Sequence, residues 1–491
     1  MINYYNLKII LNYNKYMGLG NLIQLNSVGS EDKYLYGNPQ MTHFKSIYKR
    51  ASNFAINYST VPVGNANAGF GKEIKFNIPF KSDLLSALYF KIKFSDIIRK
   101  STFTYSNGTT STNSQFTSYV NGIGFNCFEY IKLYINGNLI QTLDSKLIYL
   151  INELNNDYTK KKSFYNMTLF DKYGFSIGND NKESVNTTLL VPFFFSRNYS
   201  HSLPLCALTH SEVQLVIKFK EVEKCLIKSY NVNGDNDLGI DGYVTKTTTY
   251  STQSVITTEG PSGAVPAQNE QYNEEVIANI DSFEVFSENI YLGDNEKKMF
   301  LNRELTYLVE LYHIGNMQRI TNPTKGVTYS MDLESKNSTK YIAWYLQRED
   351  VYDANNYENN TYTFPIKYTT NHYHVNRNKH ILDNATLSLN NNDLNDTLDA
   401  KFLSDVQLYQ KFGNSSEGTV YVLSFALKPR KHEPTGTINF SRILYKTLKL
   451  TLVDESYYTN NNFKPNILFN YYSSFYNILV VNDGLAGLMY Q

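Results

Sequence analysis

The sequence has few cysteines, and their number and spacing exclude a disulfide framework. Cys127, Cys206 and Cys225 are odd in number and form no Cys-x-x-Cys pair. Small secreted domains are held together by an even set of paired cysteines, which this chain lacks. We therefore expect reduced thiols in a cytosolic compartment.

Two further features that are missing are an excess of charge and a long apolar run. Lys and Arg number 46 against 45 Asp and Glu, a net charge of +1, so no basic surface is available to recruit nucleic acid or an acidic membrane. The longest apolar runs, such as residues 189–195, fall far short of the ~20 residues that span a bilayer. Residues 2–16 lack the basic start and continuous apolar core of a signal peptide. These absences predict a soluble protein that does not bind nucleic acid directly.

What the chain has is length and aromatic side chains. With 491 residues it is long for one hydrophobic core, so we expect two domains of roughly 200 to 250 residues each. Aromatics make up 15% of the residues, with 42 Tyr and the single Trp344. Tyr combines a large apolar body with a polar tip, which suits strands that are half buried or lie at interfaces.

The first half reads as successive strands. Apolar and polar residues alternate, or β-branched and aromatic residues cluster, over 54–61, 74–78, 84–94, 128–140 and 276–292. Asn136-Gly137 interrupts the fourth of these runs and predicts a tight hairpin turn. Asp144 is placed to cap a helix that runs to Leu154. The polar residues 101–118 predict a loop, and 230–275 have too few apolar residues for a core and predict an exposed insertion.

The second half repeats this pattern after a short helix over 294–302. Strands are predicted over 304–313, 341–346, 419–427 and 444–452, with a hairpin over 385–394. Pro429 and Pro434 bracket a basic loop between the last two strands. The correspondence of the hairpins and of the Pro-led segments in the two halves favours an internal duplication of a β unit.

Several of these segments resemble one protein family. Tyr421-Val-Leu-Ser-Phe-Ala-Leu-Lys-Pro429 followed by Pro434-Thr-Gly-Thr-Ile-Asn-Phe-Ser-Arg-Ile443 is similar to a motif of the major capsid proteins of nucleocytoplasmic large DNA viruses. Residues 37–55, 189–219 and 476–490 resemble the same family in the same order, and Met17 resembles its start. The departures are residues 1–16, the 230–275 insertion and the Asn-rich loops.

The resemblance implies an all-β fold of two consecutive jelly-roll β-sandwich domains with a few short helices. The expected domains are an N-terminal extension and inner-face segment over 1–45, a first jelly roll over 46–292 with its 230–275 insertion loop, and a second jelly roll over 303–491. The implied function is that of a structural major capsid protein, not an enzyme. It would trimerise into pseudo-hexagonal capsomers and tile the icosahedral shell of a large DNA virus, assembled in the host cytoplasm.

The partners that the resemblance implies are two further copies, neighbouring capsomers, minor capsid proteins and an inner membrane. Two alternatives stay open: a minor capsid paralogue of the same fold, and a cellular jelly-roll protein of the carbohydrate-binding or cupin-like kind. The second alternative predicts a tight His/Glu metal cluster on inward-facing strand positions, and the sequence shows none.

Candidate chemistry is sparse, and we expect no catalytic or cofactor-binding residues. His372 and His374 form a His-x-His pair near His380 that can hold a metal, but no third ligand has a clear spacing. Residues 235–241 lack ligands that a calcium loop requires. The run Lys160-Lys-Lys162 is interpreted as a solvated loop. The abundant Asn-x-Ser/Thr triplets arise by chance in an Asn-rich chain, and glycans on outer loops stay open.

A basic cluster at Lys45, Lys49 and Arg50 accompanies Phe44, Ile47 and Tyr48, which have helical spacing. The cluster is interpreted as a solvated face, with contact to an inner membrane or to minor capsid proteins as the alternative.

Overall fold

The computed structural model describes two units of the chain, Met1–Ser52 and Asn53–Gln491. The described residues are 19–27, 29–30, 32, 37–45, 48–63, 68–104, 110–111, 116–120, 122–170, 185–229, 247–248, 257–258, 271–349, 380–414, 420–453 and 466–490.

The first unit contains the helix α2 (Leu19–Asn26), with exposed Ile23 and Leu25. The helical spacing around Phe44 and Tyr48 does not produce a helix, since 43–45 form a turn and 48–50 have no regular structure. Both side chains are exposed, at 99% and 80%. An isolated helix of this length is marginal in water without a surface to pack on, which accounts for the difference.

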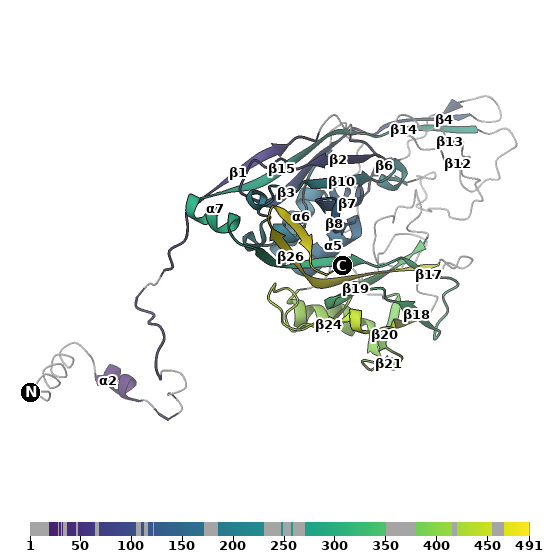
Figure 1. Ribbon diagram of the computed structural model, residues 1–491. Helices are drawn as coiled ribbons and strands as arrows, with labels where there is room; N and C mark the ends of the chain where they lie inside the picture. The colour runs from purple at the N-terminus through teal and green to yellow at the C-terminus, as the bar shows by residue number, and fades with distance from the viewer. Residues whose placement is uncertain are drawn as a thin grey trace, which may run out of the picture. The chain divides into compact units, whose positions relative to one another are not determined.

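The second unit begins with a sandwich of two four-stranded antiparallel sheets (Figure 1). The first sheet has the order β1 (Phe54–Val61), β15 (Ile280–Leu292), β3 (Leu84–Phe94), β9 (Val185–Leu190). The second has the order β2 (Glu73–Asn77), β10 (Val213–Phe219), β7 (Phe128–Ile135), β8 (Asn138–Leu143). Burial alternates along β2, where Ile74 and Phe76 face the core and their neighbours face water, as the sequence pattern predicts.

The turn between β7 and β8 is the predicted hairpin. Asn136 and Gly137 both have positive φ, 50° and 75°. That backbone twist matches the twist of the flanking strands. The hairpin in the second half is confirmed too, with Asn390 and Asn391 at φ 49° and 65° between β20 (Leu382–Leu389) and β21 (Asn392–Asp393).

The helices of this unit are short. The named α-helices are α4 (Ile123–Asn126), α5 (Ser145–Asn155), α6 (Tyr158–Thr168) and α7 (Asp294–Leu301), and the π-helical segments Phe402–Val406 and Leu408–Phe412 lie in the second half. Asp144 caps α5 as predicted, its Oδ1 accepting from the Leu147 N–H at 2.6 Å. The solvated loop predicted over 160–162 is wrong, because these residues lie in α6. Lys161 is buried there at 3.2 Å from the Glu153 carboxylate of α5.

Two small sheets lie beyond the first sandwich. They are β11 (Leu226–Ser229) with β6 (Phe116–Tyr119), and the five strands β12 (Thr247–Thr248), β13 (Thr257–Thr258), β14 (Gln271–Ile277), β4 (Ile98–Thr104) and β5 (Thr110–Ser111). The predicted loop over 101–118 and insertion over 230–275 are therefore partly wrong, because β4, β6 and β14 extend into them. The pairing of Val276 with Arg99 continues to Gln271 and Thr104, and cross-strand bonds override the polar composition there. Within 230–275, β12, β13 and the start of β14 are described, and the other residues lie outside the described ranges.

The second sandwich contains a seven-stranded and a five-stranded sheet. The larger has the order β16 (Leu305–Ile314), β26 (Ile467–Asn482), β19 (Ser338–Arg348), β23 (Tyr421–Ser424), with β17 (Gln318–Ile320), β24 (Ile438–Asn439) and β27 (Leu485–Leu488) paired at its sides. The smaller has the order β18 (Thr328–Asp332), β25 (Lys446–Leu452), β20, β21, with β22 (Leu398–Asp399) on β20.

In the first half, the single strand predicted over 276–292 is interrupted at 278–279 by the break between β14 and β15.

The segment 419–452 has the predicted order of strand, loop and strand, but its two strands do not pair with each other. β23 pairs with β19 in the larger sheet, whereas β25 pairs with β18 and β20 in the smaller one. The segment therefore crosses from one sheet of the sandwich to the other. Its first strand ends at Ser424, earlier than expected, and a series of bends follows.

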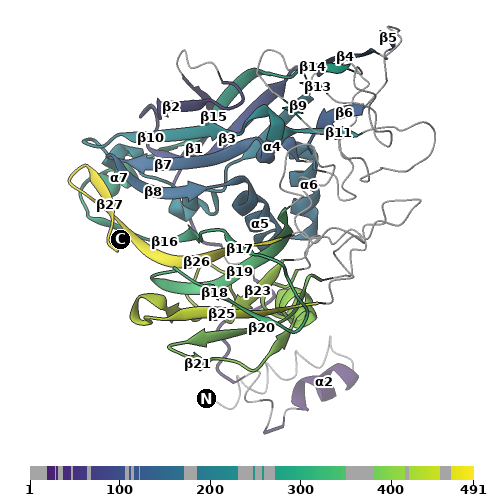
Figure 2. The ribbon, with the colours of Figure 1, turned by 90° about the vertical axis from the view of Figure 1, so that its right-hand side faces the viewer.

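The larger sheet is covered on both faces (Figure 2). Trp344 and Tyr471 pack in the core of the second sandwich, whereas Tyr345 and Tyr472 belong to the core cluster of the first. Consequently β26 is buried along nearly all of its 16 residues. Strands buried on both faces lack the alternation of half-exposed ones.

The C-terminal hairpin adds a contact to the first sandwich. The Gly484 carbonyl accepts from the His210 N–H at 3.1 Å and from the Ser211 hydroxyl at 2.9 Å. A Cβ at Gly484 would lie 2.5 Å from Thr209 Oγ1, and φ there is 78°, so only glycine fits. The last strand pair of the chain is thus docked on a loop of the first half.

Candidate functional site at the junction of the two sandwiches

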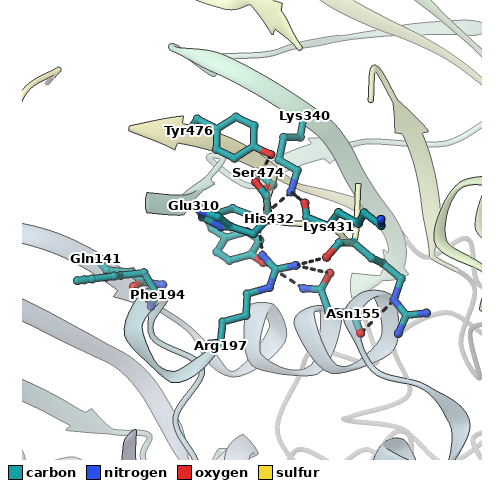
Figure 3. Close-up of polar contacts among 12 residues, drawn as sticks. Gln141, Asn155, Phe194, Arg197, Glu310, Lys340, Lys431, His432, Ser474 and Tyr476 are labelled. Atoms are coloured by element: carbon teal, nitrogen blue, oxygen red, sulfur yellow. Dashed lines mark hydrogen bonds and ion pairs between the residues drawn. The ribbon is translucent and has the colours of Figure 1, made fainter. Parts of the chain in front are cut away.

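A buried carboxylate, Glu310 on β16, is the centre of the junction (Figure 3). Lys340 on β19 donates to its Oε2 at 2.8 Å, and Ser474 on β26 donates to its Oε1 at 2.7 Å. The side chains of Glu310 and Lys340 are 2% and 1% exposed. Three adjacent strands of one sheet therefore meet at this carboxylate.

A β-bulge places Lys340. The pairing of β19 with β26 shifts register between Thr339 and Tyr341, so Lys340 is an extra residue with no partner on β26. A bulge re-aims a side chain relative to the regular alternation. Lys340 is directed to Glu310, and its ammonium also donates to the Lys431 carbonyl at 3.2 Å.

The first sandwich contributes Arg197, which follows the 3-10 turn Phe194–Ser196. Its guanidinium forms an ion pair with Glu310 Oε2 and donates to Asn155 Oδ1 of α5 at 3.2 Å. It also donates to the Arg430 carbonyl at 3.4 Å. One guanidinium therefore joins α5, β16 and the basic loop 428–434, and in Figure 3 it lies between Asn155 and Glu310.

These contacts set the ionisation of the group. Burial opposes the charge on Glu310, but Arg197 and Lys340 outweigh it and hold the pKa of the carboxyl below its usual value. Burial lowers the pKa of Lys340, and Glu310 partly offsets that effect. Both Glu310 oxygens accept from the protein, Oε1 from the Ser474 hydroxyl and Oε2 from Lys340 and Arg197. The arrangement ties the three strands to one carboxylate.

The basic loop 428–434 also caps the end of α5. Arg430 donates to the Asn155 carbonyl at 3.2 Å, to the Phe412 carbonyl at 3.0 Å, and to Asp157 Oδ1 at 2.6 Å. Asn414 donates to the Glu153 carbonyl at 2.8 Å. The last carbonyls of a helix have no partner within the helix, so these side chains from the second half satisfy them.

Two histidines face each other across the same junction. His201 lies in the 3-10 turn Tyr199–His201 of the first half, and His432 lies in the basic loop. Their ring centroids are 3.9 Å apart and their planes are inclined by 53°. Tyr476 of β26 donates to the His432 carbonyl at 2.9 Å, and the Lys340 ammonium lies 5.0 Å from the Tyr476 ring centroid.

A second polar region joins the start of α5 to the larger sheet. Tyr472 donates to the Asp144 Oδ2 at 3.2 Å, and Lys146 donates to the Gln347 Oε1 at 3.0 Å. Burial, together with the charge of Lys220, lowers the pKa of Lys146 to about 7. Both ends of α5 are thus bonded to the second sandwich.

The predicted metal candidates fall mostly outside the described residues. His372 and His374 lie there and stay predictions. His380 is half buried, and its Nδ1 lies 3.4 Å from the Tyr421 hydroxyl, next to the core of the second sandwich. Within the described part of the chain, no three His, Cys, Asp or Glu side chains come together as metal ligands. The cysteines Cys127, Cys206 and Cys225 are free thiols, as expected.

Sequence reasoning missed the junction residues. Arg197, Glu310, Lys340 and His432 are far apart in the chain and match no motif. One available signal was Lys340, a charged residue directly before the apolar run 341–346. A second was Glu310 within a strand that is otherwise apolar. A charge inside a buried strand requires a partner.

Comparison with known proteins identifies the class and then the family. Two family models match the chain: "Major capsid protein N-terminus" over residues 42–261 and "Large eukaryotic DNA virus major capsid protein" over residues 296–487. The architecture is the double jelly roll, which confirms the predicted fold class. The chain belongs to the major capsid proteins of large eukaryotic DNA viruses.

Individual relatives agree with this assignment. The major capsid protein of Paramecium bursaria Chlorella virus 1 is 26% identical over 505 residues, covering 96% of this chain and 99% of the relative. Probable capsid protein 4 of Acanthamoeba polyphaga mimivirus is 23% identical, with coverage of 96% and 99%. Both relatives are named as capsid proteins.

Two solved structures share the fold. A chain of the PBCV-1 virus capsid has a TM-score of 0.66 at 22% identity, covering 92% of this chain and all of that one. The Faustovirus major capsid protein has a TM-score of 0.68 at 13% identity, covering 93% and 94%. None of the helices in the described ranges has the length and apolar composition needed to cross a membrane.

Proposed function

We propose that this chain trimerises into pseudo-hexagonal capsomers that tile the icosahedral shell of a large DNA virus. The observation that carries the proposal is the close packing of two jelly rolls in one chain of a capsid family. Three such chains would present six sandwiches, and the Glu310 junction would fix the angle between the two sandwiches of each. The proposed role is structural, without catalysis and without direct binding of nucleic acid.

An exposed apolar edge supports self-association. The strand β1 lies at the edge of its sheet, and Phe54, Ile56 and Tyr58 on one of its faces are 56%, 43% and 61% exposed. Monomeric proteins rarely expose an apolar edge strand, since it promotes association. An obligate trimer contact would bury on the order of 2,000 Å² or more. We propose that the β1 edge is part of the contact between copies.

The remaining assignments follow the family and the sequence. We propose that residues 17–50 lie on the inner face of the shell, where minor capsid proteins and an inner membrane would be partners. The loop 350–379 would lie on the outer face. The domain boundaries at 45, 292 and 303 are part of the same proposal, as is assembly in the host cytoplasm.

The first test is the mass of the purified chain by light scattering, with negative-stain imaging of the same peak. We expect a mass near three times 56.5 kDa and hexagonal outlines. A monomeric mass would contradict the trimer. A trimer present at low copy number in virus particles would instead identify a minor capsid paralogue.

The β1 contact has its own test. Ile56→Asp places a charge in the proposed interface, and we expect the trimer to dissociate at micromolar concentration. Asn57→Asp adds the same charge on the opposite face of the same strand and should leave the mass unchanged. Equal masses for the two variants would rule out the β1 edge.

Removal of residues 17–50 tests the inner-face proposal separately. We expect trimers to form and shells to fail, and a truncated protein that forms normal particles would contradict the assignment.

A further inference from the structure

His201 and His432 place two ionisable rings in contact across the junction, which packing alone does not require. Both imidazoles are half buried, and they come from opposite sides of the junction. His201 has a backbone bond within its own turn, from its N–H to the Asn198 carbonyl at 2.9 Å, and its Nδ1 lies 3.3 Å from the Ser200 hydroxyl. The ring contact joins the turn 199–201 to the loop 428–434, beside the bond from Arg197 to the Arg430 carbonyl.

The charges around the pair are predominantly positive. Arg197 faces it from the first sandwich, Glu310 from β16 and Lys340 from β19. Two positive charges and one negative give +1 when both imidazoles are neutral, and +3 when both are protonated. Tyr476, from β26, has its pKa raised to about 12, mainly by burial, and stays uncharged.

We infer that His201 and His432 form an acid-sensitive latch between the two sandwiches, closed while both rings are uncharged and opened when they are protonated. Two imidazolium ions with centroids 3.9 Å apart repel each other. Arg197 and Lys340 add to the repulsion, and Glu310 is already engaged by both. Acidification therefore separates the turn 199–201 from the loop 428–434.

The ionisation behaviour agrees with this geometry. Burial, then His432 and then Arg197, lower the pKa of His201 to about 4. Burial also lowers the pKa of His432, although Glu310 opposes the change. In the unfolded chain histidine has a pKa of about 6.5, so between roughly pH 6.5 and pH 4 the unfolded chain binds more protons. The latch therefore contributes stability above about pH 6.5 and loses it as the pH falls through this window.

This window separates the latch from the Glu310 cluster. Because the pKa of Glu310 is lowered, its stabilising contribution is present above its unfolded value of 4.5 and is lost only at lower pH. Within this junction, loosening between pH 6.5 and 5 would thus come from His201 and His432 and not from Glu310, whereas His313 and His380, whose pKa values are also lowered, lie elsewhere. In an assembled particle, the latch would weaken the chain in an acidified compartment, a consequence that rests on the proposed function.

The direct test measures each imidazole in the unmodified full-length protein. Exchange of the histidine C2 hydrogen, followed by mass spectrometry across pH, reports the pKa of each ring without any substitution. We expect both His201 and His432 to titrate below the ordinary value for histidine, about 6.5. If either ring titrates at or above that ordinary value, the latch is contradicted.

Variants test whether protonation opens the junction. H201Q/H432Q keeps two neutral polar side chains at all pH values, and H210Q is the matched control on an exposed histidine. Between pH 7.5 and 5.0 we expect the fall in Tm of the double variant to be smaller than that of the unmodified protein by about 3–6 °C. H210Q should behave as the unmodified protein does.

Backbone hydrogen exchange locates the effect. After correction for intrinsic rates, residues 199–202 and 428–433 should exchange at least about fivefold faster at pH 5.0 than at pH 7.5 in the unmodified protein. The double variant should not show this acceleration. Unchanged exchange in both segments of the unmodified protein would overturn the proposal even if the variants failed to fold. The same exchange experiment can be made on a trimer or on a monomer, so its result does not depend on the proposed function.

Discussion

The strands β2 and β26 illustrate two ways of burying a sheet. Along β2 every second residue faces water, so Glu73, Lys75 and Asn77 are solvated. Along β26, and on β19 beside it, both faces are covered, and polar side chains such as Ser474 and Lys340 have no route to solvent. A polar group on the first kind of strand needs no partner, whereas on the second kind it must find one inside the protein.

The junction follows from this difference. Glu310, Lys340 and Ser474 lie on the doubly covered sheet, and each satisfies another. Buried ion pairs gain little over apolar packing of the same volume, but breaking one leaves an uncompensated charge. We therefore interpret the pair as a device for orienting the sandwiches, and not as a source of stability.

The largest expected effect comes from removing one partner. Glu310→Ala leaves Lys340 buried without its carboxylate and should lower the free energy of unfolding by about 3–5 kcal/mol, measured by urea denaturation. The matched variant E310M/K340M removes both buried charges, and Arg197, which is 26% exposed, can turn to water. We expect the double variant to recover most of the loss. A double variant as unstable as E310A would show that the pair itself is stabilising.

An intermediate effect is expected at Gly315, at the end of β16. A Cβ there would overlap the ring of Tyr471, which is held in the second core, so Gly315→Ala should cost about 1–3 kcal/mol through overpacking. Gly137 in the β7–β8 turn is the matched control, because a Cβ there would meet nothing within 4 Å although φ is 75°. Gly137→Ala should cost about 1 kcal/mol from backbone strain alone. Urea denaturation compares the two, and a larger loss at Gly137 than at Gly315 would contradict the two-faced burial.

The smallest effect is expected on a face exposed to water. Lys91 of β3 lies 3.9 Å from Glu284 of β15, and the two side chains are 55% and 50% exposed. Solvent screens such a pair, so Lys91→Ala should change the unfolding free energy by less than about 0.5 kcal/mol in the same denaturation experiment. A loss above about 1 kcal/mol, the upper end for exposed pairs, would mean that this face is covered in solution, for example by another copy.

The same contrast explains what could be predicted from the sequence. Local sequence patterns predicted the structure correctly where one face of a strand is exposed to solvent. They predicted the alternation along β3, the Asn136-Gly137 turn and the Asp144 cap. Lys161 was misassigned because its partner Glu153 lies on the preceding helix, and a charge run without a visible partner resembles a solvated loop. The pairing of chain segments, by contrast, is a property of the folded chain.

For that reason the contacts of the junction could not be predicted from the sequence. Lys340 faces Glu310 only because of a one-residue bulge, which no pattern in 338–348 announces. The contact of His201 with His432 joins residues that are 231 positions apart. The resemblance of 421–443 to the capsid family located the right segment, and the structure adds that its loop contributes Arg430 and His432.

The docking of Gly484 on the loop 209–211 constrains the order of events during synthesis. A ribosome covers the most recently added residues of the chain, so the hairpin of β26 and β27 is released after every strand of the first sandwich. The strands of the first sandwich are complete once β15 has been made, roughly 200 residues earlier, which at about 5–20 residues per second is a wait of some 10–40 s. During that interval the face of the first sandwich that the larger sheet later covers is open to water. The core of the first sandwich, which includes Tyr472, Leu479 and Val481, is therefore completed only after β26 has left the ribosome.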